Sequence, residues 1–281
     1  MIRTDLRYHR PGTPREAGAL LAGHAGDAVV LGGGTVLLPM MGRAEITARH
    51  VVDLRGLGLD AITEHAGHVE IGAMATYRHL YTSPVLARRV PLLSRMAVGI
   101  TGGEQIRNLG TIGGSACFAN PSSEVPAVLV ALGATLRLHG PAGYRDVAAA
   151  GFFGGAFATD LADGEFLASL LVPHQQGRTG YHKLKLCEGS WPIVTAVATA
   201  DPERDGAAVT VGAAQAVPAR IELTALLSGD GGLDLGSVDA LVRRQIDDPW
   251  SDVLADGTYR REVAGAVVRR AVTDLFEGPN R

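Results

Sequence analysis

The sequence predicts an α+β protein built in two parts, and three observations support this expectation. Up to about residue 172, short apolar segments typical of strands are interspersed with helical stretches. A short polar connector at residues 173–177 separates this region from the rest. Beyond it, strand-like segments follow one another without long helices between them, which favours an antiparallel sheet. With 281 residues, the chain is long enough for one large domain or two ordinary ones.

The elements of the first part are predicted from capping residues and apolar patterns. A helix is expected over residues 14–25, where Thr13 is a plausible N-cap and Glu16 completes a capping box. Short strands are expected at residues 28–31, 50–54, 69–73, 134–139 and 166–172. Further helices are expected from Thr76 up to residue 98, and from Ser122 or Ser123 with an apolar face over residues 125–132.

The second part is predicted to contain strands at residues 179–186, 191–200 and 207–216, followed by helices near residues 220–227 and 237–245. A longer helix closes the chain, because apolar side chains recur there at helical spacing, at Tyr259, Val263, Val267, Ala271 and Leu275. The arginines around them are expected to form a solvated face or, alternatively, a surface for a partner protein; they are Arg260, Arg261, Arg269 and Arg270.

Composition and charge exclude several classes of protein. The 46% apolar and 20% charged content is typical of a globular protein. A net charge of −3 gives no general reason to expect nucleic acid as a partner. We find no apolar run long enough for a membrane helix. Residues 1–5 carry an acid and lack the apolar core of a signal peptide, so we expect a cytoplasmic protein.

Two glycine-rich turns, at residues 29–35 and 110–115, are the most informative local feature. Glycine lets the backbone approach a ligand closely, and successive N–H groups in such a turn can form a concave anion site. Two such turns can clasp a diphosphate, which indicates a nucleotide cofactor such as FAD. Ordinary tight turns are the alternative, because the chain has 37 glycines. Leu37 replaces the third glycine of a Rossmann fingerprint, so that site is disfavoured.

Residues that often carry chemistry elsewhere are sparse here. Cys117 and Cys187 are far apart in sequence, whereas a [2Fe–2S] cluster needs four ligands, so an internal cluster is not expected. Cys117 follows the second glycine turn and is a candidate to line that site. The nine histidines show no clear metal-binding spacing. Phe152 and Phe153 are expected in the core. We therefore expect no catalytic side chain and no metal ligand.

The order of motifs resembles one family, the FAD-binding medium subunits of molybdenum hydroxylases such as carbon monoxide dehydrogenase and xanthine dehydrogenase. Residues 31–41, L-G-G-G-T-V-L-L-P-M-M, resemble its A-G-G-H-S-L-L-P-M-M segment, and Val52-Asp53-Leu54 follows at the expected distance. Residues 105–115, Q-I-R-N-L-G-T-I-G-G-S, are similar to its Q-I-R-N-x-A/G-T-I-G-G-N/S. Further matches are Phe152-Phe153, the segment 165–173, the segment 183–194 and the closing residues 257–261.

The resemblance implies a PCMH-type fold, in which two α/β subdomains sandwich FAD and a smaller C-terminal domain has an antiparallel sheet with helices. It implies an FAD-binding domain over residues 1–174, with subdomains of about 1–55 and 56–174, and a C-terminal domain over residues 177–281. The FAD contacts that it implies are Val29, Val30, Leu31, Gly32, Gly33, Gly34, Thr35, Val36, Thr101, Thr111, Ile112, Gly113, Gly114, Ser115, Glu124, Leu167 and Lys183.

The chain departs from the family pattern at two places. Gly34 and Thr35 stand where the family usually has His-Ser, so one polar contact is changed. The family's motif A-D-P-x-x-D/E reads A-N-P-S-S-E here, so Asn120 replaces its first aspartate and Glu124 stands at its last position. Asn120 removes a carboxylate, while Glu124 lengthens the other and can still accept hydrogen bonds from ribityl or adenosine hydroxyls. These changes leave the expectation of FAD binding intact.

The function that the resemblance implies is electron exit from a larger enzyme. A large partner subunit with a molybdenum–molybdopterin cofactor would oxidise the substrate, and a small partner with two [2Fe–2S] clusters would pass electrons to FAD in this chain. A dimer of heterotrimers is the family expectation. One alternative is a stand-alone FAD-dependent oxidoreductase. Another is an assembly module without cofactor, against which the retained glycines argue.

Overall fold

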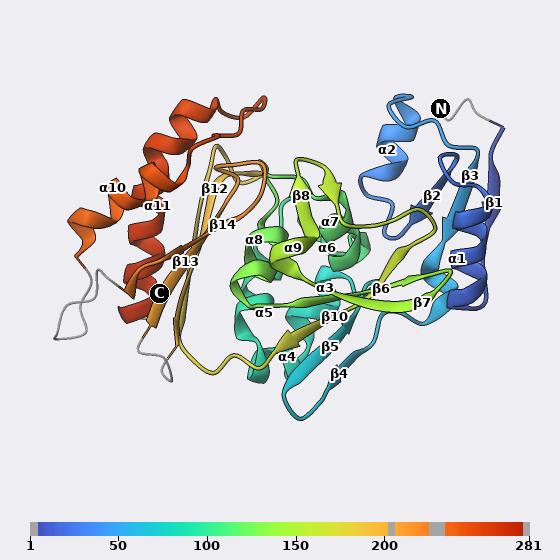
Figure 1. Cartoon of the computed structure of the whole chain (residues 1–281), viewed down its shortest axis with the longest axis horizontal. Helices are drawn as coiled ribbons and strands as arrows, with labels where there is room; N and C mark the ends of the chain where they lie inside the picture. Colours follow the sequence, from blue (N-terminus) through green and yellow to red (C-terminus); the bar gives the residue numbers. More distant parts are fainter. Residues whose placement is uncertain (1–4, 202–205, 225–233, 278–281) are drawn as a thin grey trace.

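The computed structural model describes residues 5–201, 206–224 and 234–277, and begins with a small parallel sheet. Strands β1 (Arg7–His9), β2 (Ala28–Leu31) and β3 (His50–Asp53) lie in the order β1-β3-β2. Helix α1 (Pro14–Gly23) packs beside this sheet, at one end of the molecule (Figure 1). Helix α2 (Leu37–Gly42) and a 3₁₀ helix (Leu54–Leu57) complete this region.

A second, antiparallel sheet has the order β4-β5-β10-β6-β7. Its strands are β4 (Ile62–Glu64), β5 (His68–Gly72), β6 (Thr135–Gly140), β7 (Gly143–Ala148) and β10 (Phe166–Pro173). The helices of this region are α3 (Tyr77–Thr82), α4 (Pro84–Arg89), α5 (Pro91–Val98), α6 (Gly103–Leu109), α7 (Ile112–Phe118), α8 (Glu124–Ala131) and α9 (Ala149–Phe152). A two-stranded ribbon, β8 (Phe153–Gly155) with β9 (Ala158–Thr159), lies beside them.

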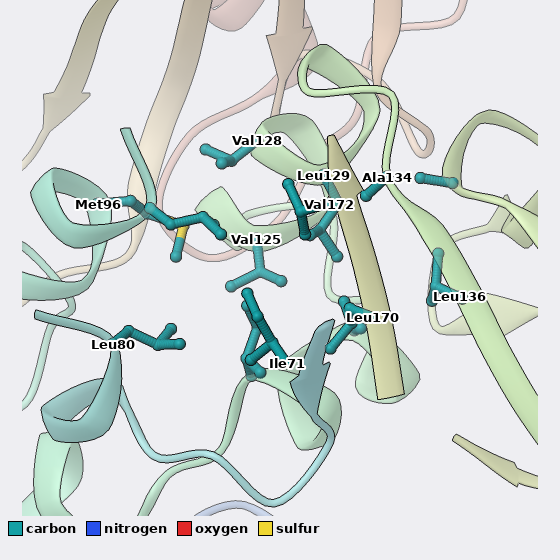
Figure 2. Packing of buried hydrophobic residues seen from close by; sticks show 14 of the residues in the cluster. Ile71, Leu80, Met96, Val125, Val128, Leu129, Ala134, Leu136, Leu170 and Val172 are labelled. Atoms are coloured by element: carbon teal, nitrogen blue, oxygen red, sulfur yellow. The ribbon is translucent and has the colours of Figure 1, made fainter. Parts of the chain in front are cut away.

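The largest core lies between this sheet and its helices (Figure 2). Ile71 and Leu170 project from adjacent strands, and Leu80, Met96 and Leu129 meet them from α3, α5 and α8. All five side chains are fully buried. Burying side chains of this size stabilises the fold by roughly 1.5–3 kcal/mol each. Phe152 and Phe153 also belong to this core, as predicted.

The last sheet is antiparallel with the order β11-β12-β13-β14. Its strands are β11 (Thr179–Lys185), β12 (Pro192–Asp201), β13 (Gly206–Gly212) and β14 (Ala219–Glu222). Helices α10 (Leu235–Gln245) and α11 (Gly257–Glu277) pack against it (Figure 1). Along β12, Ala196 and Ala198 join the core with α11, whereas Val197 joins the large central core. Because side chains alternate along β12, the two faces of this sheet pack against different cores.

The strands and helices largely lie where the sequence predicts them, and the differences have local causes. Residues 213–216 lie beyond the end of β13 rather than in a strand. The prediction of a helix near residues 220–227 is wrong at its start, where β14 forms instead. The end of that predicted helix, residues 225–227, lies outside the described part of the chain, and so do residues 1–4. Glu16 accepts from the backbone N–H of Gly12 rather than of Thr13, so the predicted capping box is incomplete.

The prediction that the arginines of the last helix form a solvated face is wrong at Arg260. Its side chain is completely buried, and Tyr259 beside it, expected on the apolar face, is 45% exposed. Arg260 donates hydrogen bonds to the carbonyl oxygens of Ile193 and Ala213 and pairs with Asp252. A buried guanidinium is tolerated because acceptors surround its donors. In the described part of the chain, no helix has the length and apolar character needed to cross a membrane.

Candidate functional site

The two glycine-rich turns lie directly against each other. The first begins in the last part of β2 and continues past its end, and the second follows α6 and runs into the first turn of α7. An added Cβ atom at Gly33 would lie 1.9 Å from the carbonyl oxygen of Leu109, closer than any two such atoms can approach. An added Cβ atom at Gly32 would lie 3.2 Å from Oγ1 of Thr111. Glycine is therefore required at position 33, because any side chain there would force the two turns apart.

The second turn is anchored to the segment that follows β5. The backbone N–H of Gly113 donates to the carbonyl oxygen of Ala73, and that of Ile112 donates to Ala75. A Cβ atom at Gly113 would lie 2.5 Å from the same Ala73 oxygen. Thr111 begins α7 as its N-cap, with Oγ1 accepting from the N–H of Gly114 at 3.0 Å. The position of this turn is thus set by backbone contacts with the central sheet.

A cavity of about 310 Å³ opens beside the two turns. Twelve of the seventeen side chains and backbone positions predicted to contact the cofactor line it. They are Val29, Val30, Gly32, Gly33, Gly34, Thr35, Val36, Thr111, Gly113, Gly114, Ser115 and Leu167. Its other walls are mainly apolar, and Cys117 lies among them as expected. Its size lies within the range of small-molecule sites.

A second cavity of about 850 Å³ adjoins the first. Thr101 and Glu124, two further predicted contacts, line it together with Asn120. Both cavities share wall residues: Thr35, Val36, Met40, Ile46, Ser115, Cys117, Phe118 and Trp191. We call the two cavities together the cleft. The glycine turns line one cavity of the cleft, and the buried carboxylate of Glu124 lines the other.

Three predicted contacts do not line the cleft. Leu31 and Ile112 are instead buried in apolar clusters. Lys183 on β11 instead pairs with Glu124 at the start of α8, with Nζ 2.5 Å from Oε1. It also donates to the carbonyl oxygen of Gly99 at 2.7 Å. Lys183 therefore reaches the cleft only through Glu124.

The cleft wall holds one buried ion pair and two buried groups that stay uncharged. The Glu124 side chain is 1% exposed and that of Lys183 is 15% exposed, so each charge has the other as its counter-ion. Burial raises the pKa of Cys117 to about 12, so its thiol stays protonated at neutral pH. Burial also raises the pKa of Tyr77, whose hydroxyl is hydrogen-bonded to Ser115. Apart from the Glu124–Lys183 pair, these groups are neutral.

Several residues of the cleft were missed by reasoning from sequence. Met40, Met74, Phe118, Phe166 and Trp191 all line it, from five different segments of the chain. Trp191 was noted only as part of a motif at the beginning of the last sheet. No spacing rule links these positions, because the fold assembles them from distant segments. Large apolar residues at motif edges were the only available signal.

The fold and the cleft define a cofactor-binding protein of the α+β class, and comparison with known proteins gives its family. A family model described as the FAD binding domain in molybdopterin dehydrogenase matches residues 4–175. The carbon monoxide dehydrogenase medium chain of Afipia carboxidovorans is 35% identical over 97% of both chains. The medium chain of Hydrogenophaga pseudoflava is 34% identical, also over 97% of both. The chain belongs to this family, as the FAD-binding part of oxidoreductases of the molybdenum hydroxylase type.

Solved structures agree with this assignment along the whole chain. The carbon monoxide dehydrogenase structure from Hydrogenophaga pseudoflava superposes with a TM-score of 0.91 at 32% identity, covering 100% of both chains. Quinoline 2-oxidoreductase from Pseudomonas putida superposes with a TM-score of 0.86 at 27% identity, covering 97% of both chains. The α+β fold with an FAD-binding region followed by an antiparallel sheet is therefore confirmed.

The residues of the cleft fit FAD. The closely packed turns at Gly33 and Gly113 present backbone rather than side chains to the cavity, which suits a diphosphate. The two connected cavities leave room for a large ligand, and the apolar walls, with Trp191 among them, suit a planar ring. The carboxylate of Glu124 offers an acceptor for hydroxyl groups.

Proposed function

We propose that this chain is the electron-exit subunit of a three-subunit molybdenum hydroxylase. It takes electrons from two [2Fe–2S] clusters in a small partner subunit and passes them to an external acceptor. A large partner with a molybdenum–molybdopterin cofactor oxidises the substrate. The observation that carries this proposal is the cleft that the two glycine turns line, in a chain that belongs to the medium-subunit family. FAD, when bound, supplies the electron-transfer chemistry.

The protein's own part is to bind and orient FAD. In the proposal, the backbone of residues 29–36 and 111–115 lies against the diphosphate and the adjoining chain. Glu124 accepts hydrogen bonds from hydroxyl groups, held in place by Lys183. Thr101 and Leu167 complete the contacts on the cleft walls. Leu31 and Ile112 fix the two turns from the core side.

The cysteines support the division of labour between subunits. The chain has two cysteines, and a [2Fe–2S] cluster needs four ligands that are usually thiolates. Cys117 is in the wall of the cleft and Cys187 is exposed, and both are free. The iron–sulfur clusters are therefore assigned to a partner.

The proposal extends to domains and assembly. Residues 1–174 form the FAD-binding domain, with subdomains of about 1–55 and 56–174, and residues 177–281 form the C-terminal domain. Each of these regions contains one main sheet, which supports the division. We propose that the complex works in the cytoplasm as a dimer of heterotrimers.

Native purification through a tag on this chain tests the proposal. We expect two co-purifying chains, a flavin band together with iron–sulfur absorbance, and molybdenum and iron by metal analysis. Flavin without partners, even under gentle conditions, would contradict the electron-exit role and favour a stand-alone FAD-dependent oxidoreductase. Turnover of an organic substrate by the purified chain alone would contradict it as well.

A further inference from the structure

Three histidines from separate segments meet at the small parallel sheet. His9 ends β1, His24 follows α1 as its C-cap, and His50 begins β3. One nitrogen of each ring lies within 4.8 Å of a nitrogen of the other two. His50 is 7% exposed, and the other two are half-buried. We call these residues the histidine cluster.

The register of the sheet explains this convergence. Arg7 of β1 pairs with His50 of β3, and His9 pairs with Val52. Because side chains alternate along a strand, His9 and His50 project from the same face. Helix α1 covers that face, since Val52 packs with residues of α1 in one apolar cluster. The end of α1 therefore places the ring of His24 against the rings of His9 and His50.

The rings are packed closely and bonded to each other. Nε2 of His9 and Nδ1 of His50 are 2.9 Å apart. The ring centroids of His24 and His50 are 3.6 Å apart, and those of His9 and His50 are 5.1 Å apart. This packing places three ring nitrogens, the atoms through which histidine binds metal ions, in one small volume.

We propose that His9, His24 and His50 bind one Zn²⁺ ion. Neutral imidazole is a preferred ligand of zinc, and three protein ligands with an open fourth position are a common zinc arrangement. Because the rings are stacked, the Zn–N distances of about 2.0–2.1 Å in a tetrahedral site require them to turn until one nitrogen of each points at the ion. Half-buried His9 and His24 have room to turn for this.

The histidine cluster is distinct from the FAD cleft. His50 pairs with Ala28 at the amino ends of their strands, whereas the first glycine turn follows the carboxyl end of β2. None of the three histidines lines either cavity of the cleft. The zinc site is therefore an addition to the proposed function and does not depend on it.

Metal binding to the full-length chain tests this inference. The chain is stripped with a chelator, dialysed against Zn²⁺ or Mg²⁺, and its bound metal and zinc affinity are measured. We expect one zinc per chain and no retained magnesium. The variants His9→Gln and His24→Gln each remove a ligand, so their zinc affinity should fall at least about 100-fold. Losing a residue that only supports a ligand already costs up to this much. Both positions are half-buried, which limits damage to the fold.

The matched controls are His65→Gln and His68→Gln, which alter a stacked pair with ring centroids 4.7 Å apart. Their zinc affinity should equal that of the unaltered chain. A second readout is the melting temperature, which zinc should raise in the unaltered chain and in the controls but not in His9→Gln. Failure of the unaltered chain to retain zinc, or undiminished affinity in a His9→Gln/His24→Gln double variant, would overturn the inference.

Discussion

Lys183 of β11 and Glu124 of α8 form a buried ion pair, with 2.5 Å between Nζ and Oε1. The same ammonium donates to the carbonyl oxygen of Gly99, after α5. One side chain of the last sheet therefore ties together two segments of the preceding region, at the wall of the cleft. Two charges this deeply buried are tolerated only because each is paired.

Lys183→Met is expected to destabilise the protein, because it leaves the Glu124 carboxylate buried without its counter-ion. The free energy of unfolding should fall by about 3 kcal/mol. Urea titration measures this change, and Lys185→Met on the same strand is the control, since Lys185 pairs with no carboxylate in the described part of the chain. The double variant Lys183→Met/Glu124→Gln should recover part of the loss. Equal stability of the two single lysine variants would contradict the interpretation.

Gly33→Ala should abolish most FAD binding. The added methyl group would lie 1.9 Å from the Leu109 carbonyl oxygen, so the two glycine turns must separate. FAD released from the purified protein by acid measures the occupancy per chain. Gly151→Ala is the control, because a Cβ atom there has nothing within 4 Å. If Gly33→Ala retained full FAD, the close contact of the turns would not be needed for the site.

Stability should depend on the charge of Asp252 in a defined pH range. Burial would raise the pKa of Asp252, but hydrogen bonds from Ser122 and the Leu254 N–H, with the charge of Arg260, hold it below its usual value of 3.8. A lowered folded-state pKa gives stabilisation that is present above pH 3.8 and is lost as the pH falls through the lower value.

The variant Asp252→Asn measures this contribution. It should cost about 2 kcal/mol near neutral pH, because Arg260 loses its carboxylate but keeps the carbonyl oxygens of Ile193 and Ala213. Denaturation at several pH values should show the difference from the unaltered protein shrinking below pH 3.8. A difference that stays constant down to strong acid would argue against the pair.

The two cysteines should react at very different rates. Burial raises the pKa of Cys117 to about 12, which keeps the thiol protonated and unreactive at pH 8. Cys187 is exposed, in the segment between β11 and β12. Mass spectrometry after brief alkylation should find one modified cysteine in the folded protein and two after denaturation. Rapid modification of Cys117 in the folded state would show that its environment is more open.

The sequence predicted the strands well because their patterns are local. Segments such as 28–31 and 166–172 are short, apolar and bounded by turn residues. The contact of the glycine turns was also predictable in kind, since clustered glycines indicate close backbone approach. Residues 220–222 were assigned to a helix, because helix and strand are hard to distinguish in so short a segment. There, pairing with β13 decides the outcome.

Features that depend on distant partners were not predictable. Arg260 was assigned to a solvated face by its neighbours in sequence, but acceptors from β12 and the segment after β13 surround it. The histidine cluster has no spacing signal, because strand register and the end of α1 bring His9, His24 and His50 together. Trp191 lines the cleft for the same reason. Such contacts appear only once the sheets are assembled.

The central claim is that FAD lies in the cleft beside the two glycine turns. Backbone hydrogen exchange with and without bound FAD tests it most directly, because it reports on individual segments of the full chain. We predict that FAD slows exchange at residues 32–36 and 111–115 together, with little change at the exposed surface of α10. Slower exchange at only one turn, or in neither, would contradict the account.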